Sequence, residues 1–408
     1  MTSRERVLMA LNHREPDRIP VDLSGHRSSG IAAMAYIKLR RHLGLEARPV
    51  RVYDPVQQLA IVEEDVLQRF GVDTIELGRA FAHEDKWWTE WVLPDGSPCL
   101  MPVWAKPERA NGEWVLRSPT NQIIARMPPS VLFFEQACYP FEEHADLDRL
   151  EAAIGEVMWA TAASPPGPIA AGADGLLRLT EGAARLRRES DRAIIGLFGG
   201  NLLEMGQFLF RNDNFFLLLA GEPDRAHAFL DRLMGLHLAN LERFLGAVGP
   251  HIDIILFGDD LGMQSGPQIS PAMYREFFQP RQRLLWRCVR KLAPHLRIML
   301  HCCGGVRELL PGLIAAGLDA INPVQITCRG MDPAGLKADF GGRLTFWGGG
   351  CDTREMIVRG TPVQVSDHVR RLMDIWRPAG GFVFQQVHNI MADVPPENIV
   401  AMLDAVNG

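Results

Sequence analysis

The chain has 408 residues, of which 47% are hydrophobic and 23% charged, and its formal net charge is −6. These values are typical of a globular protein with ample material for a core. The negative charge argues against a general nucleic-acid binder and against a polybasic membrane-surface protein. The sequence contains neither an apolar run of about 18 residues nor a secretory leader, so we expect a cytoplasmic protein without a membrane span.

Alternation of strand and helix patterns along the chain gives eight candidate units. The strands are expected at 18–24, 73–77, 193–198, 252–258, 296–301, 320–325, 344–347 and 381–387. Most of them are continuous apolar runs, which is typical of parallel strands buried on both faces. Amphipathic stretches of helical length lie between most of them, at 223–246, 271–292, 306–316, 361–376 and 395–406.

Two of these helices carry start signals, Ser270-Pro271 and Thr361-Pro362, in which a capping residue precedes proline at the first helical position. Eight strand and helix units predict an α/β fold of the TIM (β/α)₈ type, with an N-terminal helical segment before the first strand. We expect one elaborated barrel domain over 1–408.

The rhythm breaks after the second strand, where we expect an insertion over 81–191. Asp95-Gly96 and Asn111-Gly112 between β-prone residues are hairpin signals, and helices are expected at 146–159 and 175–189. The insertion is either a lid over the active end of the barrel or a solvent-side element that contacts another subunit.

Aromatic residues are concentrated in the insertion. Trp87, Trp88, Trp91 and the pair Phe133-Phe134 are suited to wall an aromatic substrate if the insertion covers the barrel mouth. A hydrophobic core for the insertion itself is the better supported use of these side chains.

The fifth strand ends in His301-Cys302-Cys303-Gly304. Because side chains alternate along a strand, His301 and Cys303 lie on one face and converge at its carboxyl end. Imidazole nitrogen and thiolate sulfur are ligands that suit Zn²⁺. The alternative is a buried cysteine beside a hydrogen-bonded core histidine.

A catalytic zinc site typically has three protein ligands and one open position. Cys351 and His388, which follow the seventh and eighth strands, compete for the third place, and the softness of sulfur favours Cys351. The other cysteines lie off the strand ends and are expected to be structural thiols in the reduced state. They are Cys99, Cys138, Cys288 and Cys328.

Further polar residues follow the carboxyl ends of the strands, where active sites of this fold are found. Those expected to orient a substrate or to take part in catalysis are Arg27, Asp259, Asp260, Asn322 and Gln325. Those expected to contact a cofactor are Gly349, Gly350 and Asn389. The alternatives are a helix cap for the aspartates, a close turn for the glycines, backbone hydrogen bonds for Asn389 and an internal ion pair for Arg27.

Several segments together resemble the uroporphyrinogen decarboxylase superfamily, whose members include corrinoid-linked methyltransferases. They are residues 1–21, Gly258-Asp259-Asp260-Leu261-Gly262, His301-x-Cys303-Gly304 and residues 393–399. They span nearly the whole chain apart from the insertion, and the barrel fold implied by the resemblance agrees with the count of strands.

The decarboxylases of that superfamily resemble one another in an arginine-rich loop after the first strand and an aspartate after the second. Here the first loop offers only Arg27, and the second strand ends in Glu76-Leu77-Gly78-Arg79. A polyanionic porphyrinogen needs several cations around it, so porphyrinogen decarboxylation is disfavoured.

The resemblance to the methyltransferase branch implies zinc ligands in His-x-Cys after the fifth strand and a cysteine after the eighth. His301 and Cys303 match the first two, and His388 stands where the branch has its cysteine. The resemblance thus implies a Zn²⁺ site of two histidines and one cysteine, with Cys351 as a substitute for His388.

The leading hypothesis is a zinc-dependent methyltransferase that moves a methyl group between a small methylated compound, such as a methoxylated aromatic, and a corrinoid. The corrinoid is expected on a separate protein, because the chain has no Asp-x-His-x-x-Gly signature. A metal-independent decarboxylase or lyase that uses Asp259 or Asp260 with Arg27, and a binding or sensor protein, are the alternatives. The sequence leaves open whether the protein is a monomer or a homodimer.

Overall fold

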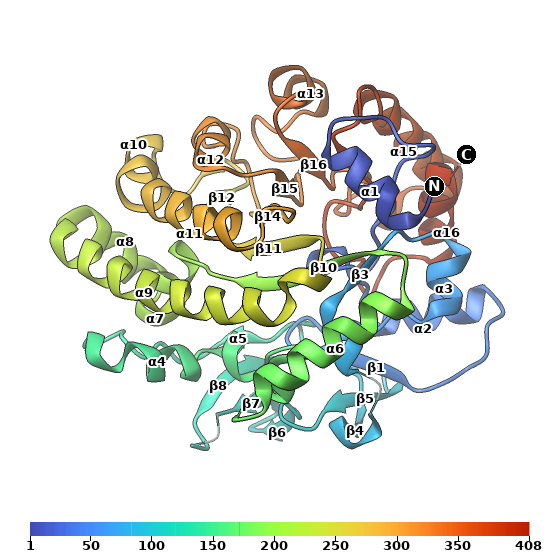
Figure 1. Ribbon diagram of the computed structural model, residues 1–408. Coiled ribbons are helices and arrows are strands. Elements are labelled where there is room, and N and C mark those ends of the chain that lie inside the picture. The colour runs from blue at the N-terminus through green and yellow to red at the C-terminus, as the bar shows by residue number, and fades with distance from the viewer. Residues whose placement is uncertain (83, 119, 171, 408) are drawn as a thin grey trace.

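The main element of the computed structural model is a curled parallel sheet of seven strands, in the order β3-β10-β11-β14-β15-β16-β17. The structure describes residues 1–82, 84–118, 120–170 and 172–407. The strands are β3 Thr74–Glu76, β10 Ala193–Gly199, β11 Ile254–Gly258, β14 Arg297–His301, β15 Ala320–Asn322, β16 Thr345–Trp347 and β17 Phe382–Val383. Helices surround the outer face of the sheet (Figure 1). The expected α/β class is confirmed.

The segment around Val21 lies between the two edges of this sheet. The backbone N–H of Asp22 donates to the carbonyl of Phe384, and the N–H of Asp73 donates to the carbonyl of Val21, both at 2.8 Å. The strand expected over 18–24 is reduced to a single bridge at Val21. Pro20 has no N–H to donate, and Ser24, with φ of 63°, has left the extended conformation. The two edges are thus joined as in a TIM-type barrel.

The interior of the curled sheet is filled by alternate residues of the strands. They are Ala193, Ile195, Ile254, Leu256, Met299, Ala320, Trp347 and Val383. Helix α1 (Ser3–Leu11) adds Val7, Ala10 and Leu11 to the same core and hydrogen-bonds to the chain just before β10 and β17. The N-terminal ends of the strands are therefore covered by α1, and the carboxyl ends form the mouth.

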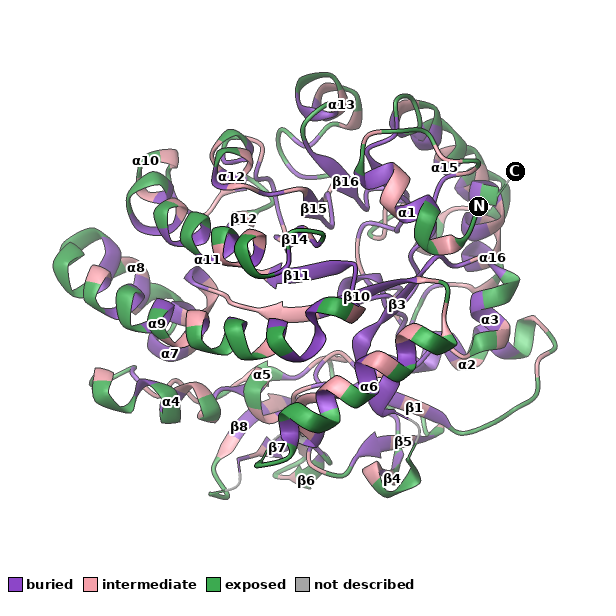
Figure 2. Cartoon of the chain, viewed as in Figure 1, coloured by how far each residue is buried: buried purple, intermediate pink, exposed green. Residues whose placement is uncertain are grey.

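The helices expected to start at Pro271 and at Thr361-Pro362 begin at their predicted caps, whereas the helix expected over 306–316 begins at Leu310 and the one expected over 271–292 is divided into α10, a π-helical turn and α11. The hydroxyl of Ser270 accepts from the N–H of Met273, and that of Thr361 from the N–H of Gln364. The helices after α1 are α2 Ala33–His42, α3 Glu64–Arg69, α4 Leu150–Glu156, α5 Met158–Thr161, α6 Gly175–Glu189, α7 Leu203–Phe210, α8 Asn212–Gly221, α9 Pro223–Val248, α10 Pro271–Met273, α11 Gln279–Leu292, α12 Leu310–Ala316, α13 Pro333–Phe340, α14 Met356–Arg359, α15 Pro362–Trp376 and α16 Pro396–Asn407. Their outward faces are exposed and the strands are buried (Figure 2). Within the described ranges, no helix has both the length and the apolarity to cross a bilayer.

Two antiparallel hairpins lie between β3 and β10. The first joins β4 (Trp88–Val92) to β5 (Pro98–Pro102), and the second joins β6 (Glu108–Ala110) to β7 (Glu113–Arg117). The second is extended by β8 (Ile123–Met127) and β9 (Glu135–Gln136). Residues 83, 119 and 171 of the expected insertion lie outside the described residues.

A strand pair that the sequence does not predict extends the first hairpin. β1 (Val50–Asp54) pairs in parallel with β5 and in antiparallel fashion with β2 (Leu59–Ala60), upstream of β3. Helix α6, which the sequence assigns to the insertion, packs against α9 and therefore belongs to the helix layer of the barrel. The β-rich region is thus held to the barrel through residues on both sides of β3.

Candidate metal centre at the open end of the barrel

The mouth beside Val21 and β3 carries buried charges that neutralise one another. Asp22 is fully buried, lies 3.2 Å from Nε2 of His26, and accepts hydrogen bonds from Trp347 Nε1 at 2.7 Å and Thr74 Oγ1 at 2.8 Å. Burial alone raises the pKa of Asp22, but His26 and these donors hold the pKa below its usual value. Asp22 therefore links Thr74, Trp347 and His26 on this side of the mouth.

Arg27 is paired with a carboxylate from the unpredicted strand β1. Its Nε lies 3.0 Å from Oδ2 of Asp54, which is 1% exposed, and its guanidinium lies 5.0 Å from the centre of the Trp159 ring. Of the two roles expected for Arg27, the geometry favours the internal ion pair over the binding of a substrate anion. The alternation of Val50–Asp54 is the sequence signal from which Asp54 could be inferred.

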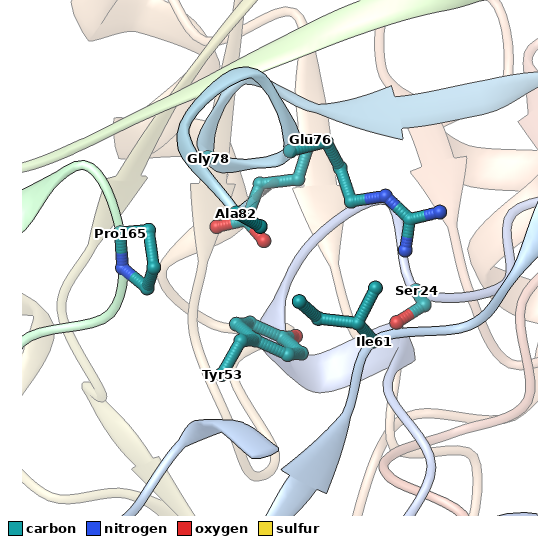
Figure 3. A pocket seen from close by; sticks show the side chains of 8 residues that line it. Ser24, Tyr53, Ile61, Glu76, Gly78, Ala82 and Pro165 are labelled. Carbon is teal, nitrogen blue, oxygen red and sulfur yellow. The ribbon is translucent and has the colours of Figure 1, made fainter. Parts of the chain in front are cut away.

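A small pocket lies next to this pair, lined by Ser24, Tyr53, Glu76, Arg79 and Pro165 among others (Figure 3). Burial raises the pKa of Glu76 to about 7, against the positive charge of Arg27. The buried hydroxyl of Tyr53 has no hydrogen-bond partner among the described residues. This side of the mouth therefore contains buried carboxyl and hydroxyl groups, those of Glu76 and Tyr53.

The insertion reaches the mouth through a tryptophan that the sequence did not single out. Trp88 and Trp91 are 8% and 6% exposed and pack in hydrophobic clusters, which is the core role expected for them. Trp159 in α5 stacks on Arg27, and Pro165 lines the pocket. A lid role for the insertion stays a prediction.

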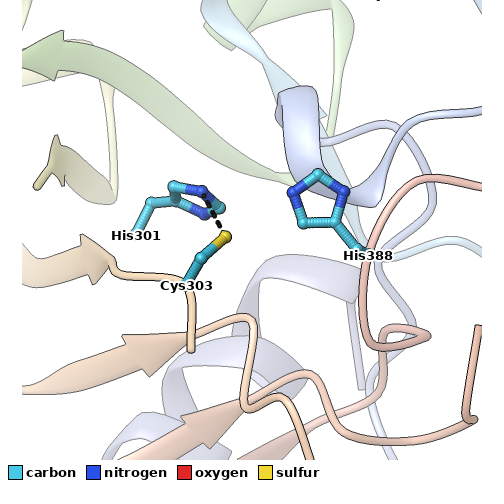
Figure 4. A group of neighbouring side chains, drawn as sticks. All are labelled: His301, Cys303 and His388. Atoms are coloured by element: carbon cyan, nitrogen blue, oxygen red, sulfur yellow. Dashed lines mark hydrogen bonds between the residues drawn. The ribbon is translucent and has the colours of Figure 1, made fainter. Parts of the chain in front are cut away.

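On the opposite side, His301 and Cys303 leave the end of β14 in the same direction. Met299 lies in the interior core, so the side chains two and four positions later also face inward. Sγ of Cys303 lies 3.4 Å from Nε2 of His301. The predicted convergence of imidazole and thiol is therefore present (Figure 4).

His388 is the third member of the group. The ligand atoms of His301, Cys303 and His388 all lie within 4.8 Å of one another. Cys351 is fully buried, and its Sγ contacts the carbonyl of Asp352 at 3.8 Å. The fold thus brings His388, and not Cys351, to the pair from β14.

The loop after Cys303 is fixed by two polar residues that the sequence placed at the site. Oδ1 of Asp260 accepts from the N–H of Cys303 at 2.7 Å, and Oε1 of Gln325 accepts from the N–H of Gly304 at 2.5 Å. Gly304 has φ of 89°, and a Cβ there would lie 2.2 Å from the carbonyl carbon of Gly262. This turn therefore requires glycine, and it sets the position of the thiol.

Asp259 and Asp260 point in different directions, as neighbours at the end of a strand must. Oδ1 of Asp260 lies 3.6 Å from Nε2 of His301, at the open site. Asp259 is buried and accepts from the N–H groups of Leu203 and Glu204 at the start of α7, and burial raises its pKa to about 7. Helix capping fits Asp259, and proximity to the metal centre fits Asp260.

Both imidazoles are held at Nδ1 by side-chain amides. Oδ1 of Asn322 lies 2.8 Å from Nδ1 of His301, and the amide of Asn389 lies 2.7 Å from Nδ1 of His388. Burial lowers the pKa of His388 to about 3, with a smaller effect from the neighbouring His301. His388 is therefore neutral at physiological pH, which is the form that binds metal ions.

The glycines after β16 are explained by packing. A Cβ at Gly348 would lie 2.2 Å from the carbonyl oxygen of Pro323, and a Cβ at Gly350 would lie 2.5 Å from the Phe384 ring. The N–H of Gly350 donates to the carbonyl of Gln385 at 2.8 Å. A cofactor contact at Gly349, Gly350 or Asn389 stays a prediction.

Two residues near His301 lie among the polar residues that follow the strands but were assigned no role from the sequence. The hydroxyl of Ser28 donates to Oδ1 of Asn322 at 2.7 Å, and Oε1 of Gln385 accepts from Nδ2 of Asn322 at the same distance. Gln385 lies two positions after Val383 of the interior core, so strand alternation is the signal that could have found it. Ser28 has no comparable signal.

Comparisons with known proteins show which family this chain is similar to. Residues 165–408 match the family model "Uroporphyrinogen decarboxylase (URO-D)". A uroporphyrinogen decarboxylase of Legionella pneumophila (strain Lens) is 23% identical over 190 residues, which are 47% of this chain and 50% of that protein. The chain thus spans about half the length of the curated relative it matches.

A methyltransferase from Methanosarcina mazei has a similar structure, with a TM-score of 0.58 and 16% sequence identity over 100% of this chain and 98% of that chain. At this identity the likeness concerns the fold. The family model covers more than half of the sequence, including the ends of β11, β14 and β17 that carry the candidate site. The chain belongs to the uroporphyrinogen decarboxylase family.

Proposed function

We propose that this protein is a zinc-dependent methyltransferase that moves a methyl group between a small methylated compound and a corrinoid carried by a separate protein. The observation that carries the proposal is the group formed by His301, Cys303 and His388, whose ligand atoms lie within 4.8 Å of one another at the mouth. The fold shared with the Methanosarcina mazei methyltransferase supports the choice of reaction.

The donor set fits zinc. Two imidazoles and one thiol are borderline and soft ligands, which suit Zn²⁺ better than Mg²⁺ or Ca²⁺. Three protein ligands leave a fourth position for substrate, as in catalytic zinc sites. When bound, the ion supplies Lewis acidity that stabilises the anion of a thiol, a phenol or a similar group.

The chain's own residues would fix and polarise the substrate around this position. Asp260 reaches the edge of the site next to His301 and is suited to accept a hydrogen bond from a substrate hydroxyl or ammonium group. Asp260 accepts from the N–H of Cys303 and Gln325 accepts from the N–H of Gly304, and these two bonds hold the thiol-bearing loop so that the three donors keep their spacing. A methoxylated aromatic is the substrate class we favour, because Trp159 of the insertion lies against Arg27 at the mouth and offers an aromatic face.

The alternative, a metal-independent decarboxylase that holds a carboxylate substrate with Arg27, is weakened by the pairing of Arg27 with Asp54. Of the two acids assigned to it, Asp259 is engaged by the start of α7, whereas Asp260 lies at the open site. Because the Legionella relative is named a decarboxylase, the test below also measures decarboxylation.

The test uses the zinc-loaded protein and reduced free cobalamin as the methyl acceptor. A panel of methoxylated aromatics, methylated thiols and methylated amines is incubated with both, and methylcobalamin is followed by its absorbance. We expect methylation with at least one class of donor and its loss when a zinc chelator is added. Release of CO₂ from carboxylated substrates without cobalamin, unchanged by the chelator, would contradict the proposal.

A further inference from the structure

Asn322 is a fully buried residue whose side-chain amide has only one consistent orientation. Its Nδ2 lies 2.9 Å from the backbone carbonyl of Trp347, which can only accept, and 2.7 Å from Oε1 of Gln385. Gln385 uses its own Nε2 to donate to the carbonyl of Ser28 at 3.1 Å, so its oxygen is also an acceptor. The nitrogen of Asn322 is therefore fixed toward these two oxygens.

The oxygen of Asn322 must then face the hydroxyl of Ser28 and Nδ1 of His301, at 2.7 and 2.8 Å. An amide oxygen accepts and cannot donate, so Nδ1 of His301 carries the ring proton. A neutral imidazole has a single ring proton, and Nε2 is left with its lone pair. That nitrogen is the one that lies 3.4 Å from the sulfur of Cys303.

We propose that Asn322 is a positioning residue that fixes the tautomer and the ring direction of His301, so that Nε2 is ready to bind a metal ion. Histidine ligands commonly donate their second ring N–H to an oxygen, and the partner raises metal affinity. The inference rests on the proposed zinc site. It replaces the expectation that Asn322 contacts the substrate.

Asn389 does not offer the same argument for His388. Its amide lies 3.2 Å from the carbonyl of Arg27 and 3.3 Å from that of Ser28 as well as near Nδ1 of His388. Both carbonyls can only accept, so the amide nitrogen of Asn389 faces them and donates to Nδ1 of His388, which is then the acceptor nitrogen of that ring. The tautomer with a free Nε2 is therefore assigned to His301 alone.

The test compares Asn322→Leu with a matched control, Asn398→Leu. Asn398 is also buried, at 1% exposure, and donates to two backbone carbonyls, those of Ile357 and Gly360, which are not part of the site. Zinc affinity is measured by competition with a chromophoric chelator, and thermal unfolding is measured on the metal-free proteins. We expect Asn322→Leu to bind zinc about 10- to 100-fold more weakly than the wild type. Asn398→Leu lowers the unfolding temperature and leaves the affinity unchanged.

A second readout does not depend on metal. In ¹⁵N-histidine-labelled, metal-free protein, with His301 assigned by the loss of its signals in His301→Gln, we expect His301 protonated on Nδ1. In Asn322→Leu the ring should shift toward the Nε2-protonated form, and Asn322→Asp, which retains an oxygen acceptor, should restore the wild-type state.

The outcomes separate this inference from the proposed function. Equal zinc affinity and unchanged His301 signals in Asn322→Leu would overturn the role of Asn322. A wild-type protein that binds no zinc would contradict the metal site, while the tautomer measured by NMR would still decide whether Asn322 controls His301.

Discussion

The two sides of the barrel mouth differ in what their polar side chains contact. Beside Val21 and β3, the polar side chains lie close to partners within the protein, with Arg27 3.0 Å from Asp54 and His26 3.2 Å from Asp22. At the ends of β14 and β17, the imidazoles use only Nδ1 for amide contacts and leave donor atoms near a thiol. We therefore expect the binding site at the ends of β14 and β17, where the donor atoms face one another, and not beside Val21 and β3, where the side chains are paired with other residues.

The largest effect is expected from breaking the ion pair on the first side. Arg27→Ala leaves the carboxylate of Asp54 buried without its partner, which should lower the free energy of unfolding by about 3 to 5 kcal/mol. Urea denaturation measures the change. The double variant Arg27→Met with Asp54→Leu, which removes both charges, should recover much of the loss. An Arg27→Ala protein as stable as the wild type would show that the contact with Asp54 does not stabilise the fold, and the comparison would fail.

The second-largest effect is expected on zinc affinity, at the ends of β14 and β17. Cys303→Ala removes one of three ligands and should weaken zinc binding more than about 100-fold, beyond the loss typical of outer-shell partners. Cys302→Ala is the matched control, because Cys302 is buried and its sulfur accepts from the N–H of Leu261. Its zinc affinity should equal that of the wild type. Similar losses in both variants, measured by chelator competition, would indicate a general disturbance of the strand end.

The smallest effect is expected from Glu76, whose buried carboxyl group makes stability depend on pH. The pKa of Glu76 is about 7 in the folded protein, against an ordinary value of 4.5. Between these pH values the folded protein holds a proton that the unfolded chain has released, so rising pH lowers the free energy of unfolding. Glu76→Gln should therefore gain about 1 to 3 kcal/mol over the wild type between pH 5 and pH 8.

The measurement is a series of urea unfolding curves of both proteins across this pH range. The difference between them isolates Glu76 from the histidines that titrate in the same interval. A difference that is constant with pH would show that the Glu76 carboxyl is charged in the folded protein, and the pocket would then be more polar than its burial indicates.

The fold was predictable because its signals are local. Continuous apolar runs separated by amphipathic helices mark the seven parallel strands, and the caps at Ser270 and Thr361 mark helix starts. The first strand was overestimated because Pro20 and Ser24 limit its pairing. β1 was missed because its pairing with β5 joins segments on either side of β3.

The part of the candidate site at the end of β14 was also predictable from a local sequence signal. The period of a strand places His301 and Cys303 together, and it also distinguishes Asp260 from Asp259 once the interior residues of β11 are known. Whether His388 or Cys351 lies near His301 depends on the paths of the loops after β17 and β16. The spacing of residues along the sequence does not determine these paths. The pairing of Arg27 with Asp54 likewise joins distant segments.

The central claim is that three uncommitted donors hold one zinc ion. A crystal structure of the protein grown with Zn²⁺, with the metal located by anomalous scattering, tests it most directly. We predict an ion bound by His301, Cys303 and His388, with distances of about 2.0–2.1 Å to nitrogen and about 2.3 Å to sulfur. An ion held by Cys351 in place of His388, or none at this position in a crystal saturated with zinc, would contradict the account.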